Sequence, residues 1–244
     1  MPPIKPSSSA GRDGPHPEPT LKEVIGALTL PDRIADSNPS NLSGFIPKCV
    51  LCLLVKAGVI RGIKSLFAEF VNDPQARIRL RASHGFCARH TDVVIETGDS
   101  LGVAILYADL ANQAILRLAG QPERRLSPAF RKSPPPCPAC VLQAEADRRY
   151  AGALGKGLAS QETWTALQSG PMLCLNHLRL TLSASDNVNS GRLRQLQTEK
   201  LSFLKAELEE IIRKNDYRFR NEAWGDERDA WLRAIKLLES DLKP

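Results

Sequence analysis

Long apolar runs are missing from this chain of 244 residues. No stretch approaches the roughly 18 apolar residues that a membrane-spanning helix needs. The first residues also lack the charged start, apolar core and cleavage site of a secretory signal. We therefore expect no membrane association and a cytoplasmic location. In that reducing compartment, paired cysteines are more typical of metal ligands or redox groups than of structural disulfides.

Aromatic residues are scarce, at 5% of the chain, and no block of five or six consecutive basic residues occurs despite a net charge of +6. Because Leu, Ala, Ile and Val supply most of the apolar mass, the composition favours packed helices over sheet. The absence of a basic arm argues against nucleic-acid binding, which stays only as an alternative. A solvated charged surface explains the spread excess of positive charge.

Cysteine is also infrequent, and all six cysteines belong to two copies of one pattern. In each copy a CxxC pair precedes a CxxH pair, and the intervening segments, 53–86 and 141–173, differ in length by a single residue. Each copy, taken in chain order, offers three sulfurs and one imidazole to a metal ion. We therefore predict two sites, the first from Cys49, Cys52, Cys87 and His90, and the second from Cys137, Cys140, Cys174 and His177.

Three thiolates and one imidazole suit zinc, and four protein ligands leave no open position for water or substrate. We therefore expect two structural zinc ions per chain and favour a non-enzymatic protein. Iron–sulfur clusters or dithiol redox chemistry at the same cysteines are the alternative. His84 competes with His90 as a ligand, because it lies three residues before Cys87. The second copy has Pro171 at the matching place, which favours His90.

The apolar periodicity predicts an all-α fold with two pseudo-repeated helical units, each stapled by a Cys3His metal site. A long helix and a terminal helix are expected to close this pair of units. Gly58 and Gly62 weaken the first long helix but permit close approach by a neighbouring helix. Asp73 is expected to cap the helix that begins at Pro74. The terminal helix, starting near residue 226, is expected to bury Trp231, Ile235 and Leu238.

Composition shifts along the chain divide it into five segments. The Pro- and Ser-rich head is expected to be disordered, and a basic Pro-rich stretch is expected to link the two metal-binding units. The segments are a tail (1–19), an N-terminal unit with the first metal site (20–119), the linker (120–136), the second metal-site unit (137–185) and C-terminal helices (186–244).

The region from about residue 45 to residue 235 resembles a bacterial family catalogued as a domain of unknown function. The paired motifs carry this resemblance together with the strings at residues 85–90, 101–110, 212–219 and 225–231 (GFCARH, LGVAILYADL, IRKNDYRF and GDERDAW). The resemblance brings no activity with it.

The closed ligand sets favour a zinc-dependent binding or scaffold protein, whose partner is an unidentified protein or small molecule. Segment 213–219 (RKNDYRF) is dense in charged and aromatic residues for a connector. It is either a binding loop or a set of salt bridges that locks the last two helices to the repeated units, and the second interpretation is favoured. Asp99 and Asp109 are expected to cap or to form salt bridges rather than to act as acid and base.

Overall fold

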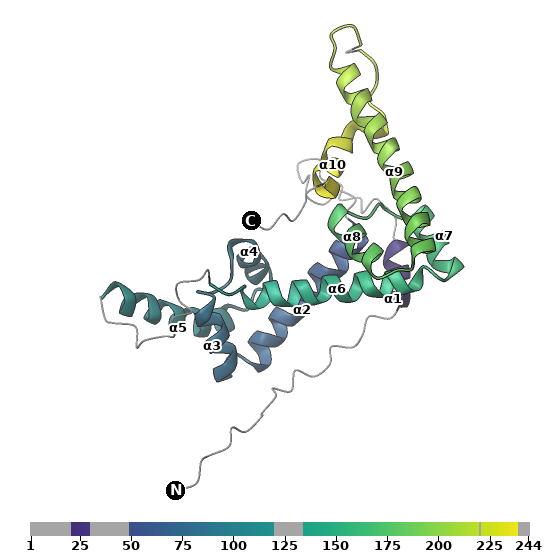
Figure 1. Cartoon of the computed structure of the whole chain (residues 1–244). Helices are drawn as coiled ribbons and strands as arrows, with labels where there is room; N and C mark the ends of the chain where they lie inside the picture. Colours follow the sequence, from purple (N-terminus) through teal and green to yellow (C-terminus); the bar gives the residue numbers. More distant parts are fainter. Residues whose placement is uncertain (1–20, 30–48, 120–133, 220, 239–244) are drawn as a thin grey trace.

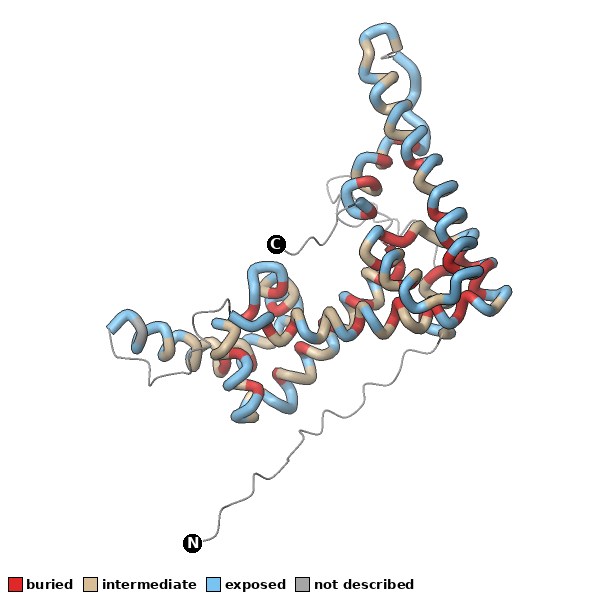
Figure 2. The backbone as a smooth tube through the Cα atoms, viewed as in Figure 1, coloured by how far each residue is buried: buried red, intermediate tan, exposed pale blue. Residues whose placement is uncertain are grey.

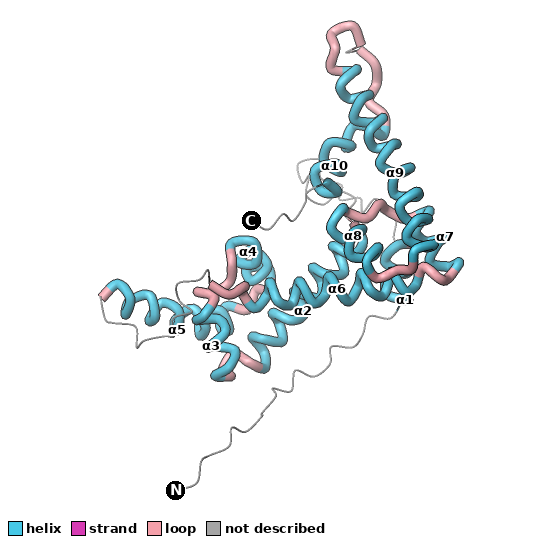
Figure 3. The backbone as a smooth tube through the Cα atoms, viewed as in Figure 1, coloured by secondary structure: helices cyan, strands magenta, loops and turns pink. Residues whose placement is uncertain are grey.

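A computed structural model describes residues 21–29, 49–119, 134–219 and 221–238 of the chain. Within those ranges the protein is helical, and they contain no strand (Figure 3). The all-α prediction is therefore confirmed. The expected tail at residues 1–19 and most of the expected linker at 120–136 lie outside the described residues.

Ten α-helices and one 3-10 helix, η2, make up the described fold. In chain order they are α1 (Leu21–Leu28), α2 (Val50–Glu69), α3 (Pro74–Ala82), α4 (Ala88–Glu96), α5 (Ser100–Leu118), α6 (Pro138–Gly157), α7 (Gln161–Ser169), α8 (Leu175–Ser183), α9 (Asn187–Lys214), η2 (Asp226–Asp229) and α10 (Ala230–Leu238). The helix expected to begin at Pro74 is α3, and the terminal helix expected to start near residue 226 corresponds to η2 followed by α10.

The two long helices α2 and α6 pack against each other at the centre of the molecule (Figure 1). Gly62 of α2 faces Leu142 in the first half of α6, and Gly58 faces Ala146 one turn further along. The numbering rises along one helix as it falls along the other, so the two helices are antiparallel. At Gly62 an added Cβ would lie 2.7 Å from Leu142 Cδ1, so the expected close approach is confirmed there, whereas at Gly58 the nearest atom would be at an ordinary 3.9 Å.

The C-terminal half of α6 carries many buried residues. Helices α1 and α8 pack against α6, α7 packs against α1, and Figure 2 shows buried positions gathered in this region. At Gly155 a Cβ would lie 2.9 Å from both Ala184 Cβ and the Thr181 carbonyl oxygen, so only glycine lets the end of α8 approach this closely. Helix α8 is thereby held at a defined distance from α6.

Side chains of the long helix α9 position the chain that leads into α8. The Gln197 amide oxygen accepts a hydrogen bond from the Leu173 backbone N–H at 3.0 Å. Lys200 donates to the carbonyl oxygens of Leu167, at 2.7 Å, and Gly170. Because Leu173 directly precedes Cys174, these contacts fix the start of α8.

Helix ends follow local chemistry. The Asp73 carboxylate accepts from the Gln75 backbone N–H at 2.9 Å, and Pro74 occupies the first turn of α3. The predicted cap is thus confirmed. Cys49, Cys87, Cys137 and Cys174 are the N-cap residues of α2, α4, α6 and α8, and their side chains make no capping hydrogen bond. These four sulfurs therefore stand at helix N-termini and are available for another role.

The predicted buried face of the terminal helix is wrong. Trp231, Ile235 and Leu238 are about half exposed, and α10 instead buries Ala230, Ala234 and Leu237. Helix α10 packs against α9 and η2 through these residues, while Arg233 makes a two-pronged ion pair with Glu207 of α9, both N–O distances being 2.9 Å. The buried face of α10 thus carries two alanines and one leucine, and the larger Trp231 and Ile235 stay about half exposed.

Candidate metal centres

The structure gathers all eight predicted ligands into two clusters, but it pairs the motifs differently from the sequence-order prediction. Site I consists of Cys49, Cys52, Cys174 and His177, and site II of Cys87, His90, Cys137 and Cys140. Each CxxC motif is therefore joined to the CxxH motif of the other half of the chain. The prediction that each unit is stapled by its own motifs is wrong.

Helix length explains this exchange of partners. A helix of 20 residues, such as α2, is about 30 Å long. The short helix α3 that follows is too short to bring α4 back to the start of α2, so Cys87 stays near its far end. Since α6 is antiparallel to α2, that end lies beside the start of α6, where Cys137 and Cys140 are found. The same reasoning brings α8 to the start of α2.

In site I the imidazole of His177 faces all three sulfurs with one nitrogen. Its Nδ1 lies 3.5 Å from Cys49 Sγ, 3.3 Å from Cys52 Sγ and 3.2 Å from Cys174 Sγ. The Cys52 and Cys174 sulfurs are 3.7 Å apart. Cys49, Cys174 and His177 are buried, whereas Cys52 is partly exposed.

Site II has the same internal geometry. His90 Nδ1 lies 3.3 Å from Cys87 Sγ, 3.5 Å from Cys137 Sγ and 3.4 Å from Cys140 Sγ. The Cys140 sulfur is 3.5 Å from that of Cys137 and 3.7 Å from that of Cys87. Cys137 and His90 are buried, Cys140 is partly exposed and Cys87 is exposed.

These distances fit four ligands around a single ion. A tetrahedral zinc ion with bonds of about 2.3 Å to sulfur and about 2.0 Å to nitrogen places its ligand atoms roughly 3.5–3.8 Å apart. A disulfide would require about 2.05 Å between two sulfurs, and none of the six cysteines is in one. The sites can therefore each hold one metal ion with four protein ligands.

Two side chains of α6, not predicted as site residues, orient the histidines. Asp147 Oδ1 lies 3.0 Å from His177 Nε2, and Gln143 Oε1 lies 2.9 Å from His90 Nε2. With Nε2–H donating to these oxygens, each histidine presents Nδ1 to its sulfurs in the form that binds a metal. Their spacing of four places them on one face of α6, but that spacing alone does not mark them as partners of the histidines.

Close packing of the ionisable groups shifts the pKa values of neighbouring cysteines in opposite directions. In site II burial, with the neighbouring thiols, raises the pKa of Cys140 to about 12. Burial also disfavours the thiolate of Cys137, but hydrogen bonds from His90 and from backbone amides outweigh it and lower that pKa to about 6. Neighbouring negative charges within this space repel one another. A divalent cation would relieve that repulsion and let all three thiolates form.

A groove of about 340 Å³ lies between the two sites. Both histidines and both orienting side chains, Gln143 and Asp147, line it, and Val55, Val59 and Val93 form its apolar part. Lys56, Arg89 and Lys236 supply basic side chains. Three thiolates around a divalent ion would carry a net charge of −1 at each site. Of the three basic side chains, Lys56 is paired with Glu96 at 2.9 Å.

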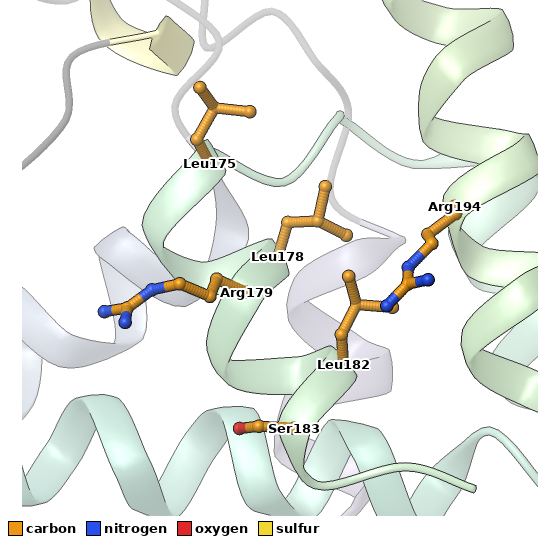
Figure 4. Close-up of a pocket in the computed structure, with 6 residues that line it drawn as sticks. All are labelled: Leu175, Leu178, Arg179, Leu182, Ser183 and Arg194. Carbon is orange, nitrogen blue, oxygen red and sulfur yellow. The ribbon is translucent and has the colours of Figure 1, made fainter. Parts of the chain in front are cut away.

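A second groove, also of about 340 Å³, runs between α8 and α9. Figure 4 shows Leu175, Leu178 and Leu182 along one side of α8, with Arg194 reaching toward Leu182 from α9 and Arg179 on the other flank. Leu178 and Leu182 also pack against the core. The groove therefore exposes the edge of the core rather than a set of reactive groups.

Other residues singled out in the sequence have structural contacts. His84 adopts a positive φ of 57° in the turn before Gly85 and belongs to neither cluster. Asp109 makes a two-pronged salt bridge with Arg81, both distances being 2.6 Å, and this bond lowers its pKa. Asp99 accepts from the Gly102 backbone N–H at 2.8 Å. The expectation of capping and salt bridging for the two aspartates is confirmed.

Contacts of segment 213–219 lie between α9 and the approach to α10. Arg213 pairs with Glu210, at 2.6 Å, and with Glu222, and Lys214 pairs with Glu227 at 2.7 Å. The Arg213 guanidinium also lies 4.6 Å from the centre of the Phe219 ring. These contacts tie the end of α9 to η2 and the residues before it, rather than to the repeated units.

The fold and the two clusters define a class: an all-helical protein in which pairs of helix N-termini present Cys3His sets that could each hold a metal ion. The chain belongs to a protein family described as a family of unknown function (DUF6062), whose model matches residues 45–244. Neither the curated proteins nor the solved structures that were compared contain a match. None of the described helices is both long and apolar enough to cross a membrane.

Proposed function

We propose that each cluster holds one zinc ion and that the two ions brace a helical scaffold that binds a partner. The observation that carries this proposal is the set of sulfur–sulfur and sulfur–nitrogen distances, 3.2–3.7 Å among the contacts above, repeated in both sites. Such spacing suits ligands that share one small ion. Four protein ligands then complete the coordination shell, which favours a structural role over hydrolysis.

Zinc is preferred over an iron–sulfur cluster on geometric grounds. In a [4Fe–4S] cluster each protein ligand binds a different iron atom, and in a [2Fe–2S] cluster two ligands share each iron. In both, bridging sulfides occupy the space between the irons and spread the two ligand groups apart. Ligand atoms within 4.8 Å of one another leave room for one ion rather than for several metal atoms. Because zinc has no redox chemistry, the proposal also separates this protein from a dithiol redox protein.

Matching helix lengths support an internal repeat within this scaffold. Helices α2, α3 and α4 contain 20, 9 and 9 residues, and α6, α7 and α8 contain the same numbers in the same order. In both sets the CxxC motif begins the long helix and the CxxH motif begins the last helix. In such a repeat, the CxxC motif of each copy pairs with the CxxH motif of the other copy.

Exposed apolar side chains support partner binding. Large residues remain accessible on α5, α9 and α10, among them Ile115, Phe203 and Trp231, and Phe203 is 74% exposed. Exposed apolar groups of this size are typical of interaction surfaces when they cluster. Six cysteines outside disulfides also support a reducing compartment such as the cytoplasm.

Elemental analysis of protein purified without added metal tests the proposal. We expect two zinc ions per chain and a spectrum without visible absorption. Iron with sulfide, or a brown protein, would favour the redox alternative, and an absence of bound metal would refute the proposal.

A further inference from the structure

The two sites differ in how far their cysteines are exposed. Two of the three cysteines of site II, Cys87 and Cys140, are at least partly exposed. Site I has only Cys52 partly exposed, and its other two cysteines are buried. Ligand exchange at a metal begins with an incoming group displacing one ligand, so an accessible thiolate provides the point of entry. Site II therefore has the more open path for exchange.

The sites also differ in the group that holds the histidine. His177 of site I donates to a carboxylate, Asp147, whereas His90 of site II donates to an amide, Gln143. A carboxylate partner makes the ligating nitrogen more basic and adds a negative charge close to the ion. A neutral amide fixes the ring orientation but adds no charge. Site I should therefore bind a cation more tightly than site II.

We propose that site II is the exchangeable metal site and site I the permanent one, with Asp147 and Gln143 setting the difference. The inference rests on the proposed function, because both sites must bind zinc for one to release it first. The exchanging ligands would be soft groups such as small thiols or nitrogen chelators, which compete with thiolate for zinc. Loss of the site II ion would release α4 from the start of α6 while α2 and α8 stay joined.

The test follows zinc release from the full-length, zinc-loaded chain mixed with excess chelator and a metal-sensitive dye. We expect two phases of one zinc ion each. Iodoacetamide added during the fast phase should label Cys87 and Cys140, identified by mass spectrometry, before it labels Cys52. A single phase, or labelling of Cys52 first, would overturn the inference.

Matched variants of α6 assign the cause. Gln143→Glu gives His90 a carboxylate partner and should slow the fast phase about tenfold or more, while Asp147→Asn should speed release from site I by about 10–100-fold. Glu145→Gln removes an exposed charge between these positions and should change neither phase. If both Gln143→Glu and Asp147→Asn leave the release rates unchanged, these residues do not set the difference. Zinc content before mixing tests the proposed function separately.

Discussion

The sulfur of Cys52 lies 3.7 Å from the sulfur of Cys174, although 122 positions separate the two residues in the chain. This contact joins the first turn of α2 to the N-terminus of α8. Its counterpart joins Cys87 to Cys140 at the same distance. Because every cluster draws on both halves of the chain, neither half contains a complete metal site. A bound ion would hold the halves to each other.

Metal content of paired cysteine variants should reveal this exchange. Cys52→Ser and Cys174→Ser each damage site I, so the double variant should lose one metal ion per chain, as either single variant does. Combining Cys52→Ser with Cys87→Ser damages both sites and should remove both ions. Elemental analysis of the purified variants gives the count.

The opposite pattern would contradict the structure. If motifs paired in chain order, Cys52→Ser with Cys87→Ser would lose one ion, and Cys52→Ser with Cys174→Ser would lose both. The two double variants are matched in the number and kind of substitutions, so general destabilisation affects them alike.

Removing the metal should unfold much of the helical structure. Structural zinc of this kind contributes on the order of 10–16 kcal/mol of apparent binding energy, which exceeds the net stability of about 5–15 kcal/mol of a typical domain. We expect helicity, followed by circular dichroism, to fall after a strong chelator is added and to recover when zinc is returned. Unchanged helicity and melting would show that the apolar core suffices by itself.

Two glycine substitutions in long helices should change stability in opposite directions. Gly155→Ala would place a Cβ 2.9 Å from the Thr181 carbonyl oxygen and 3.0 Å from the Ala184 carbonyl carbon, so backbone must move. We expect a loss of about 1–3 kcal/mol in the free energy of unfolding. At Gly58 the nearest atom would be Ala146 Cβ at 3.9 Å, an ordinary contact. Gly58→Ala should therefore gain about 0.5–1 kcal/mol, as measured by urea denaturation.

The turn before α10 should weaken in acid. Hydrogen bonds from the Gly225 backbone N–H, at 2.9 Å, and from Lys214, at 2.7 Å, lower the pKa of Glu227 from 4.5 to about 2. Because the pKa is lowered in the folded protein, its stabilisation is complete above pH 4.5 and is lost as the pH falls toward 2. The Gly225 amide resonance, followed by NMR, should titrate near pH 2.

Glu227→Gln provides the control for that titration. The variant keeps a hydrogen-bond acceptor but no ionisable group, so its Gly225 resonance should stay constant over the same range. Amides near His90 and His177 in the same spectra report acid-induced metal loss separately. An inflection near pH 4.5 in the wild-type protein would mean that the contact with Glu227 is not formed.

Local features of the fold could be predicted well. Steps of three and four between apolar residues place α2 and most other helices, and the Asp73–Pro74 pair marks the start of α3. The buried face of α10 could not be predicted in this way, because apolar residues of both faces recur at helical spacing. The face that packs against α9 is the one with Ala230, Ala234 and Leu237, beside the ion pair between Arg233 and Glu207, and local spacing reveals neither contact.

The orienting groups of the histidines lay beyond the same reasoning. Gln143 and Asp147 are ordinary polar residues on a helix, and nothing local distinguishes them from their neighbours. They contact the imidazoles because α4 and α8 bring His90 and His177 against one face of α6. Their role depends on which helices meet, and that is a property of packing.

The sequence by itself determined which eight residues form the two clusters and which helices begin at them, because motif spacing and helix periodicity act over a few residues. Only the tertiary structure decided how the motifs are paired. Helix α2 carries the chain about 30 Å from its start, and antiparallel packing through Gly58 and Gly62 brings the other half of the chain alongside. Each CxxC motif therefore lies beside the CxxH motif that is farther from it in the sequence.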